Sequence, residues 1–258
     1  MTVIIDDISA AELEIYRSLR DNAFSKDNSF IADSPKVVNV LLNSKLEVKS
    51  ILATREYYEE FEELLLLKNI PKKYVATKDE MQKIVGHKVH HNCMMHGIRP
   101  KDVSLNDLGD KIIMLDKITS SENVGSIARS AAALGIDSYM LAKESPHPFN
   151  RRALRVSMGH TSSLKVHIYH DIKEVITALR DKGYRVFAAE IQENSTPLLK
   201  IQVPHKWVLV MGHEGNGISG EVLSLCDEVV TIEMQEEIKS LNVSVAASII
   251  MYQFINRG

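Results

Sequence analysis

The sequence has few cysteines and no segment suited to crossing a membrane. Cys93 and Cys226 are the only cysteines among 258 residues, which is too few for a disulfide framework and typical of a reducing compartment. No apolar run approaches the length that spans a bilayer. The N-terminal residues MTVIIDDISAAELE lack the basic and long apolar regions of a signal peptide. We therefore expect a cytoplasmic protein without membrane contact.

A strong net charge is also absent. The formal net charge is −3, which by itself does not indicate a nucleic-acid-binding protein, so the distribution of charge matters more. Between Lys143 and His167 the only acidic residue is Glu144, whereas the basic residues are Lys143, Arg151, Arg152, Arg155 and Lys165. The simplest interpretation of such an isolated cluster is a solvated loop.

The first hundred residues predict a small α/β unit. With 45% hydrophobic and 25% charged residues, the chain is an ordinary globular protein with room for one large domain or two smaller ones. Helices are expected over 10–19, from Pro35, over 56–67 and after the capping box Thr77-x-x-Glu80, and strands over 49–53 and 74–76. A capping box is also expected at Ser9-x-x-Glu12. This domain, 1–100, ends at a polar linker over 101–109.

Histidines crowd into one segment of this unit. His87, His90, His91, Cys93 and His96 lie within ten residues, and imidazole and thiolate ligands can hold zinc. The cluster lacks a clean ligand pairing and a second cysteine, so we favour a polar strand and turn, with no metal site, over a zinc site.

After the linker, strands and helices alternate. Strands are expected over 111–115, 138–142, 164–168, 184–189, 208–211 and 228–232, and helices over 123–134, after Asp171 and over 241–255. Gly135 and Gly183 follow two of these helices as C′ residues. This pattern over 110–258 predicts a mostly parallel sheet with helices on both faces.

One strand leads into a glycine-rich loop. Val208-Leu209-Val210-Met211 reads as a strand buried on both faces, and Gly212-His213-Glu214-Gly215-Asn216-Gly217-Ile218-Ser219 follows it. The spacing is not that of a dinucleotide fingerprint. It fits a phosphate loop better, but Ile218 stands where the phosphate-binding lysine is needed. A ligand site is therefore expected at the carboxyl end of this strand, and a glycine turn that serves only the fold stays possible.

Two further segments combine helix starts with polar side chains. The first is Glu122-Asn123-Val124-Gly125-Ser126-Ile127-Ala128-Arg129, in which Asn123 suits a cap and Arg129 falls on the polar face. The second is Ser240-Leu241-Asn242-Val243-Ser244-Val245-Ala246, in which Ser240 is a natural N-cap and Asn242 lies in the first turn of an otherwise apolar helix.

Together the three segments resemble the motifs of the SpoU-type RNA ribose 2′-O-methyltransferases of the SPOUT superfamily. In order, these are Asn123-Val124-Gly125-x-Ile127-x-Arg129, Gly212-x-Glu214-Gly215-x-Gly217 and Ser240-Leu241-Asn242-Val243-Ser244-Val245-Ala246. The match covers the chain from Lys111 onward, and the N-terminal unit more loosely resembles the family's ribosomal-protein-like RNA-binding domain.

The resemblance implies a deep trefoil knot in the C-terminal domain, a homodimer with sites near its interface, and S-adenosylmethionine as cofactor. The catalytic residues carried over are Asn123, Arg129, Glu214, Ser240 and Asn242. The cofactor-binding residues are Met211, Gly212, Glu214, Gly217, Ile232, Met234, Leu241 and Asn242. In the loop before the third motif, Glu233 and Glu236 stand where the family often has Pro and Gly, and both bear on the cofactor contacts there.

The implied function is methylation of a ribose 2′-hydroxyl in structured RNA, with ribosomal RNA preferred and transfer RNA possible. In this context Arg151, Arg152 and Arg155 become candidates for holding the RNA backbone. Two alternatives are a non-catalytic RNA-binding protein with a degenerate methyltransferase fold and an ordinary doubly wound nucleotide enzyme. The second requires a glycine-rich loop early in the domain, and the sequence after Leu115 lacks one.

Overall fold

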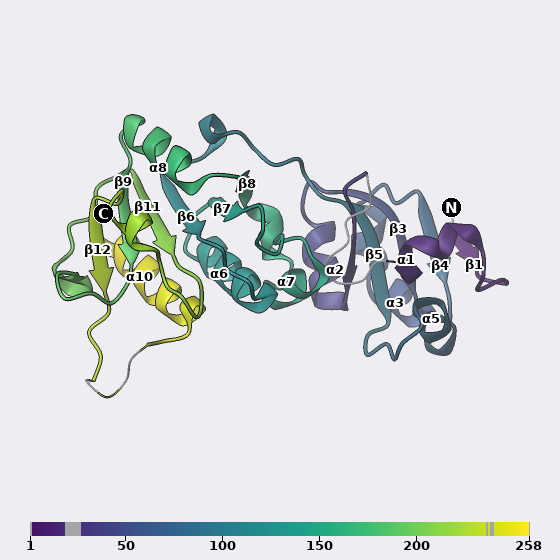
Figure 1. Ribbon diagram of the computed structural model, residues 1–258. Coiled ribbons are helices and arrows are strands. Elements are labelled where there is room, and N and C mark those ends of the chain that lie inside the picture. The colour runs from purple at the N-terminus through teal and green to yellow at the C-terminus, as the bar shows by residue number, and fades with distance from the viewer. Residues whose placement is uncertain (1, 19–26, 236, 238–239, 258) are drawn as a thin grey trace. The chain divides into compact units, whose positions relative to one another are not determined.

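The computed structural model describes residues 2–18, 27–235, 237 and 240–257, and the chain divides into two compact units (Figure 1). Unit 1 comprises the chain up to Lys101 together with Pro148–Ser162, and unit 2 comprises Asp102–His147 and the chain from Ser163 onward. None of the described helices is long and apolar enough to span a membrane.

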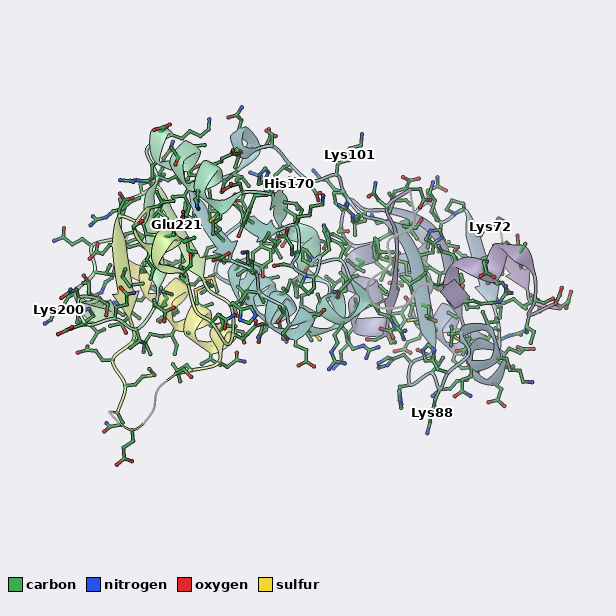
Figure 2. All side chains as sticks on the ribbon, viewed as in Figure 1. Lys72, Lys88, Lys101, His170, Lys200 and Glu221 are labelled. Atoms are coloured by element: carbon green, nitrogen blue, oxygen red, sulfur yellow. The ribbon has the colours of Figure 1, made fainter. Side chains whose placement is uncertain are left out.

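Unit 1 contains a mixed five-stranded sheet. Its strand order is β1 (Thr2–Ile4), β4 (Lys72–Val75), β3 (Glu47–Ala53), β5 (Cys93–Ile98) and β2 (Ser29–Asp33). The pairs among β1, β4 and β3 are parallel, whereas β5 runs antiparallel to both β3 and β2. Lys72 on β4 (Figure 2) pairs with Glu12 at 2.7 Å and so ties the sheet to the N-terminal segment.

Two apolar cores lie against this sheet. One contains residues of α2 (Pro35–Leu42), α3 (Arg55–Glu60) and α4 (Glu62–Leu66) with Ile51 of the sheet. The other contains residues of η1 (Ala11–Leu13), α1 (Glu14–Ser18) and α5 (Lys78–Val85) with the adjacent residue Leu52. Because successive strand residues point to opposite faces, helices cover both sides of the sheet.

The structure corrects several details predicted for unit 1. The helix expected over 56–67 is interrupted at Phe61, which leaves the helical conformation with φ −115° and ψ 26°. The capping box expected at Ser9 is wrong, because the Ser9 hydroxyl donates to Asp7 and Ala10 precedes the first helical turn. Strands β1 and β2 were not predicted, and Leu19 lies outside the described residues. The capping box at Thr77 is confirmed.

Unit 2 contains a seven-stranded sheet in which every described strand pair is parallel, which confirms the α/β prediction. Its order is β10 (Thr196–Pro197), β12 (Glu228–Thr231), β9 (Arg185–Ala189), β11 (Trp207–Met211), β6 (Lys111–Leu115), β7 (Ser138–Ala142) and β8 (Lys165–Tyr169). As expected, Gly135 and Gly183 follow helices with positive φ, at 73° and 84°.

Helices cover both faces of this sheet (Figure 1). One core joins α8 (Ile172–Asp181) and α9 (Gly220–Leu223) to alternate strand residues such as Val208 and Val210. Elsewhere in the unit, Phe254 of α10 (Val243–Arg257) packs edge-on against Trp207 and Phe187, and α10 also contacts α6 (Ser121–Ala133). Since β11 lies between β9 and β6 with every residue buried, the predicted strand buried on both faces is confirmed.

The domain boundary differs from the expected one because of a single helix. Residues 148–162 were expected within the domain 110–258, but α7 (Arg151–Val156) packs on β2 of unit 1. Leu154 of α7 is fully buried in the unit 1 core, and the ring of Phe149 lies 5.4 Å from that of Phe30. The expected linker also has structure, because Leu108 is buried within unit 2.

Asp33 holds α7 in unit 1 through two arginines. Its carboxylate, 6% exposed, accepts hydrogen bonds from Arg151 at 2.7 Å and from Arg155 at 2.6 Å. Burial alone would raise the pKa of Asp33, but the hydrogen bond from Arg155 and the charge and hydrogen bond of Arg151 outweigh it, so the pKa is lowered.

We expect Asp33→Ala to lower the free energy of unfolding by about 3 kcal/mol, because it leaves two arginines without their buried partner. The lowered pKa means that this stabilisation is present above the unfolded-state pKa and is lost as the pH falls through the folded-state pKa. Urea denaturation between neutral and acidic pH measures both effects. The matched control is Glu47→Ala, which removes an exposed ion pair with Lys49. Equal effects of the two substitutions would contradict the prediction.

Candidate cofactor and catalytic site

The glycine-rich loop after β11 folds back on itself. His213 and Gly217 exchange two backbone hydrogen bonds of 3.2 and 2.9 Å. Gly217 has φ +62°, and a Cβ atom on Gly212 would lie 2.6 Å from the Gly217 carbonyl carbon. Glycine is therefore required at Gly217 because of the positive φ and at Gly212 because the chain passes too close for a Cβ atom.

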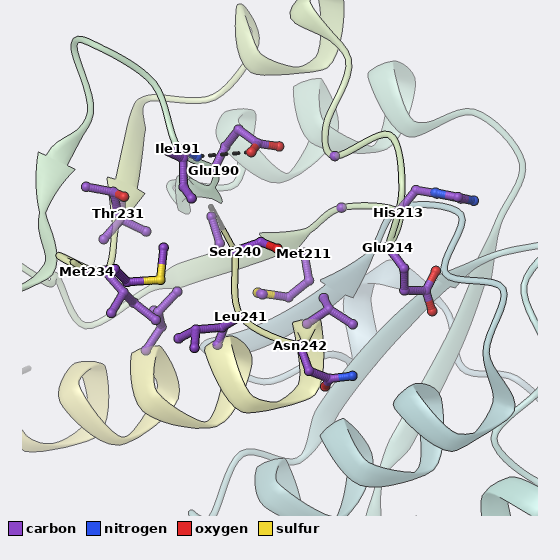
Figure 3. A pocket seen from close by; sticks show the side chains of 18 of the residues that line it. Glu190, Ile191, Met211, His213, Glu214, Thr231, Met234, Ser240, Leu241 and Asn242 are labelled. Carbon is purple, nitrogen blue, oxygen red and sulfur yellow. Dashed lines mark hydrogen bonds between the residues drawn. The ribbon is translucent and has the colours of Figure 1, made fainter. Parts of the chain in front are cut away.

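Beside this loop lies a cavity of about 490 Å³ within unit 2 (Figure 3). All eight predicted cofactor-binding residues line it: Met211, Gly212, Glu214, Gly217, Ile232, Met234, Leu241 and Asn242. Ser240 lines it too. The cavity is thus formed by four chain segments, which follow β9, follow β11, follow β12 and precede α10. Its volume falls in the range of small-molecule sites.

Glu214 ties the glycine loop to the start of α6. Its carboxylate accepts hydrogen bonds from the backbone N–H groups of Thr119 and Ser120, at 3.2 and 3.1 Å, and from the Thr119 hydroxyl at 3.3 Å. The Asn123 amide donates a fourth bond at 2.8 Å. A carboxylate next to a helix N-terminus is favoured because unpaired N–H groups and the helix dipole face it.

Asn242 extends this network to the third motif. Its amide nitrogen donates to the Asn123 side-chain oxygen at 3.2 Å, while its own oxygen accepts from the backbone N–H and hydroxyl of Ser244. Two predicted caps are therefore wrong. Asn242, not Ser240, caps α10, and Ser120, not Asn123, caps α6 by accepting the Asn123 N–H. The Asn123 side chain is therefore not used as a cap and instead forms hydrogen bonds with Glu214 and Asn242.

Arg129 does not line the cavity. Residues Val124, Ile127, Ala128 and Ala131 of α6 are buried, as predicted, and Arg129 is exposed. Among the described residues, no hydrogen-bond or ion-pair partner is found for its guanidinium group. Three of the five candidate catalytic residues, Asn123, Glu214 and Asn242, are thus directly connected, Ser240 is in the cavity wall, and Arg129 stands apart.

The described residues that line the cavity include two acidic ones, Glu190 and Glu214, and neither lysine nor arginine. Burial favours a raised pKa for Glu214, yet the hydrogen bonds from Asn123 and from the backbone of Glu214, Thr119 and Ser120 dominate and lower the pKa, so the carboxylate stays ionised. Such a wall disfavours a phosphate group and suits a ligand with a positive charge.

Glu190 was not among the predicted site residues. It follows β9 directly, and one carboxylate oxygen accepts the Ile218 N–H at 2.9 Å while the other accepts the Ile191 N–H at 3.0 Å. Its position after a predicted strand was the available signal, since parallel strands carry ligand sites at their carboxyl ends. The sequence could not reveal that β9 pairs with β11.

The predicted RNA-binding arginines lie together on α7 in unit 1. Arg151 and Arg155 are engaged with Asp33, and Arg151 is the less exposed, at 17% of its side chain against 47% for Arg155. Arg152 is exposed on the same helix. Two of the three positive charges are therefore paired with Asp33 within unit 1.

The histidine segment does not converge on one point. The His96 ring pairs with the Ser29 hydroxyl, His87 contacts the Val85 carbonyl, and Cys93 is buried in the apolar core. In the part of the chain that the structure describes, no group of three or more His, Cys, Asp or Glu side chains could hold a metal ion.

The loop before the third motif is described only in part. Glu233 is exposed and does not line the cavity, whereas its neighbours Ile232 and Met234 do. The Glu233 departure therefore leaves the cavity wall apolar at this point. Glu236 lies outside the described residues.

Comparison with known proteins identifies similar chains. The model of the SpoU rRNA Methylase family matches residues 110–252. An uncharacterized tRNA/rRNA methyltransferase of Mycobacterium bovis is 28% identical over 234 residues, which cover 88% of this chain and 81% of that protein.

Solved structures share the fold. An AdoMet-bound rRNA methyltransferase of Sinorhizobium meliloti superposes with a TM-score of 0.83 at 20% identity, covering 99% of this chain and 98% of that one. An RNA 2′-O ribose methyltransferase superposes with a TM-score of 0.79 at 16% identity, covering 100% and 99%. At these identities the likeness shows the fold alone.

We expect Asn123 and Glu214 to be energetically coupled. In a double-mutant cycle with Asn123→Ala and Glu214→Ala, the coupling free energy should be about 1 kcal/mol, because their hydrogen bond is charge-assisted but partly exposed. Chemical denaturation of the four proteins measures it. Asn216→Ala, in the same loop, replaces Glu214→Ala in the control cycle and should be additive with Asn123→Ala. Additivity in the first cycle would show that the bond contributes nothing.

Proposed function

The chain belongs to the SpoU rRNA Methylase family, and on this premise we propose that it transfers a methyl group from S-adenosylmethionine to a ribose 2′-hydroxyl in structured RNA. We propose ribosomal RNA as the preferred substrate, with transfer RNA as the second possibility. The observation that carries the proposal is the hydrogen-bond network of Glu214, Asn123 and Asn242, which joins three distant motifs beside one cavity.

The cavity fits the proposed cofactor in size and charge. S-adenosylmethionine supplies an electrophilic methyl group on a positively charged sulfonium, and the described lining residues include two glutamates and no lysine or arginine. Main chain near Met211, Gly212, Ile232, Met234 and Leu241 would hold the nucleoside, since the glycine loop leaves its backbone open to close approach.

Arg129 is proposed to act at the 2′-hydroxyl. A guanidinium is effectively always protonated, so it cannot accept the hydroxyl proton. It can instead hold the phosphate next to the ribose, and that phosphate or a water then accepts the proton. Ser240 and Asn123 would orient the ribose and Arg129, while Glu214 and Asn242 keep the loops in place through the bonds described above.

The protein is further proposed to act as a homodimer through α10. Val245, Ile249 and Tyr252 are 48%, 40% and 62% exposed, and their spacing aligns them along one side of the helix. A row of large exposed apolar side chains is typical of an interface. The hydroxyls of Ser248 on α10 and Ser130 on α6 are hydrogen-bonded, and Arg129 precedes Ser130 in α6. A second copy bound there would place the two sites near the interface.

Three more features belong to the proposal. The N-terminal unit is proposed as a ribosomal-protein-like domain that binds the RNA substrate. The backbone of the RNA would be contacted by Arg151, Arg152 and Arg155, and the exposed side chain of Arg152 best suits this role. The family resemblance also implies the deep trefoil knot in the C-terminal unit.

Labelled methyl transfer tests the proposed function. The purified protein is incubated with S-adenosylmethionine carrying an isotopically labelled methyl group and with unmodified ribosomal or transfer RNA, and digested nucleosides are analysed by mass spectrometry. We expect label in 2′-O-methylribose, mainly from ribosomal RNA. Label on a base would exclude ribose specificity. A protein that binds RNA but neither binds the cofactor nor transfers label would be the non-catalytic alternative.

Arg129→Ala should lower the turnover number by at least about 100-fold, as removal of a group that stabilises transition-state charge does. The affinity for S-adenosylmethionine should be unchanged, because Arg129 does not line the cavity. The control is Arg180→Ala, which removes another exposed arginine of unit 2, paired with Asp227. Normal turnover of Arg129→Ala would refute the assigned role.

Ile249→Glu should convert the dimer to a monomer, because it buries a charge in the proposed apolar interface. Sedimentation velocity at micromolar concentration measures the state. Thr177→Glu, on the exposed side of α8, is the control and should leave the dimer intact. A monomeric wild-type protein would disprove the proposed interface.

A further inference from the structure

Glu190 occupies a defined place in the cavity wall. It follows β9, which pairs in parallel with β11, so its side chain reaches the glycine loop from the neighbouring strand. Its carboxylate accepts the Ile218 N–H at 2.9 Å, and a Cβ atom on Gly217 would lie 2.2 Å from the same oxygen. Figure 3 shows its second oxygen bonded to the Ile191 N–H. The side chain is thus fixed at both oxygens.

The charge of Glu190 is less compensated than that of Glu214. Glu214 accepts four hydrogen bonds from Thr119, Ser120 and Asn123 around the N-terminal end of α6, where the helix dipole offsets its charge. Among the described residues, Glu190 accepts hydrogen bonds from two backbone N–H groups, whereas a carboxylate offers about four lone-pair positions. Within the described lining of the cavity, no lysine or arginine lies beside it. Its negative charge therefore acts on whatever occupies the cavity.

We propose that Glu190 makes the cavity selective for the methylated sulfonium form of the cofactor over the demethylated thioether product. This inference rests on the proposed function. S-adenosylmethionine and S-adenosylhomocysteine share the same ammonium and carboxylate groups and differ by one methyl group and one positive charge on sulfur, so a partly compensated carboxylate stabilises the first more than the second. Two unit charges about 10 Å apart near a protein surface interact with an energy that corresponds to roughly tenfold in affinity. The cavity, at about 490 Å³, has a width of this order.

The selectivity has a consequence for turnover. Transfer of the methyl group removes the positive charge from sulfur, and the attraction between that charge and Glu190 ends with it. The thioether product is then held without this contribution, which favours its replacement by a new cofactor molecule.

Isothermal titration calorimetry of the full chain with each compound tests the proposal. In Glu190→Gln, the ratio of the affinity for S-adenosylmethionine to the affinity for S-adenosylhomocysteine should fall roughly tenfold. Glutamine keeps one oxygen that can accept the Ile218 N–H while it removes the charge. The control is Glu193→Gln, in the same loop but exposed and outside the cavity wall, and it should keep the wild-type ratio.

Two further measurements separate charge from positioning. Glu190→Asp keeps the charge on a shorter side chain, so both affinities should fall while their ratio is retained. For the wild-type protein, added salt should weaken binding of S-adenosylmethionine more than that of S-adenosylhomocysteine, because only the first carries the sulfonium charge that Glu190 attracts. This second measurement needs no substitution.

The outcomes are distinct. Equal losses of both affinities in Glu190→Gln would reduce Glu190 to a loop contact and overturn the inference. A wild-type protein that binds the two compounds equally well would also overturn it, yet would leave the proposed cofactor intact. A wild-type protein that binds neither compound would instead overturn the proposed cofactor.

Discussion

The Glu214 carboxylate is the interaction on which the candidate site depends. It accepts four hydrogen bonds from Thr119, Ser120 and Asn123 and thereby fixes the glycine loop against the start of α6. Asn123 then has its amide nitrogen committed to Glu214, which leaves its oxygen to accept from Asn242. The order of donors and acceptors is forced, because an ionised carboxylate can only accept. One charge thus determines the orientation of two amides and the placement of three loops.

The parallel sheet makes this convergence possible. Asn123 and Glu214 are 91 residues apart in the chain, and Asn242 is 119 residues from Asn123. Because every described strand pair of unit 2 is parallel, the segments that leave β6, β9, β11 and β12 all emerge at one edge. The cavity opens where the turns after β9, β11 and β12 face the start of α10. Each of these turns supplies backbone or one polar side chain, so no single motif constitutes the site.

The sequence predicted the features that depend on neighbouring residues, such as strand bounds and helix ends. Strands β6 and β7 have the predicted bounds, Thr77 and Asp171 cap helices as expected, and Gly135 and Gly183 follow helices with positive φ. Features that depend on partners distant in the sequence were missed. The Asp33 carboxylate is 118 residues from Arg151, and nothing in either segment reveals that α7 belongs with unit 1. Glu190 was overlooked for the same reason, because its relation to Ile218 exists only once β9 and β11 pair. Asn242 was mistaken for a residue within the helix because Ser240 offered an equally good cap.

Three carboxylates of this protein show how surroundings assign different roles to one chemical group. Asp33 is buried and paired with two guanidinium groups, so its charge holds α7 in place. Glu214 is matched by backbone N–H groups at a helix end and by an amide, which together lower its pKa and make it an organiser of loops. Glu190 has the fewest donors of the three and lies in a cavity wall whose described residues include no lysine or arginine. A carboxylate that its own protein leaves only partly compensated favours a cation from outside. The absence of a phosphate-loop lysine and the partly compensated charge of Glu190 therefore have the same consequence: the cavity disfavours a nucleoside triphosphate and favours a nucleoside with positive charge.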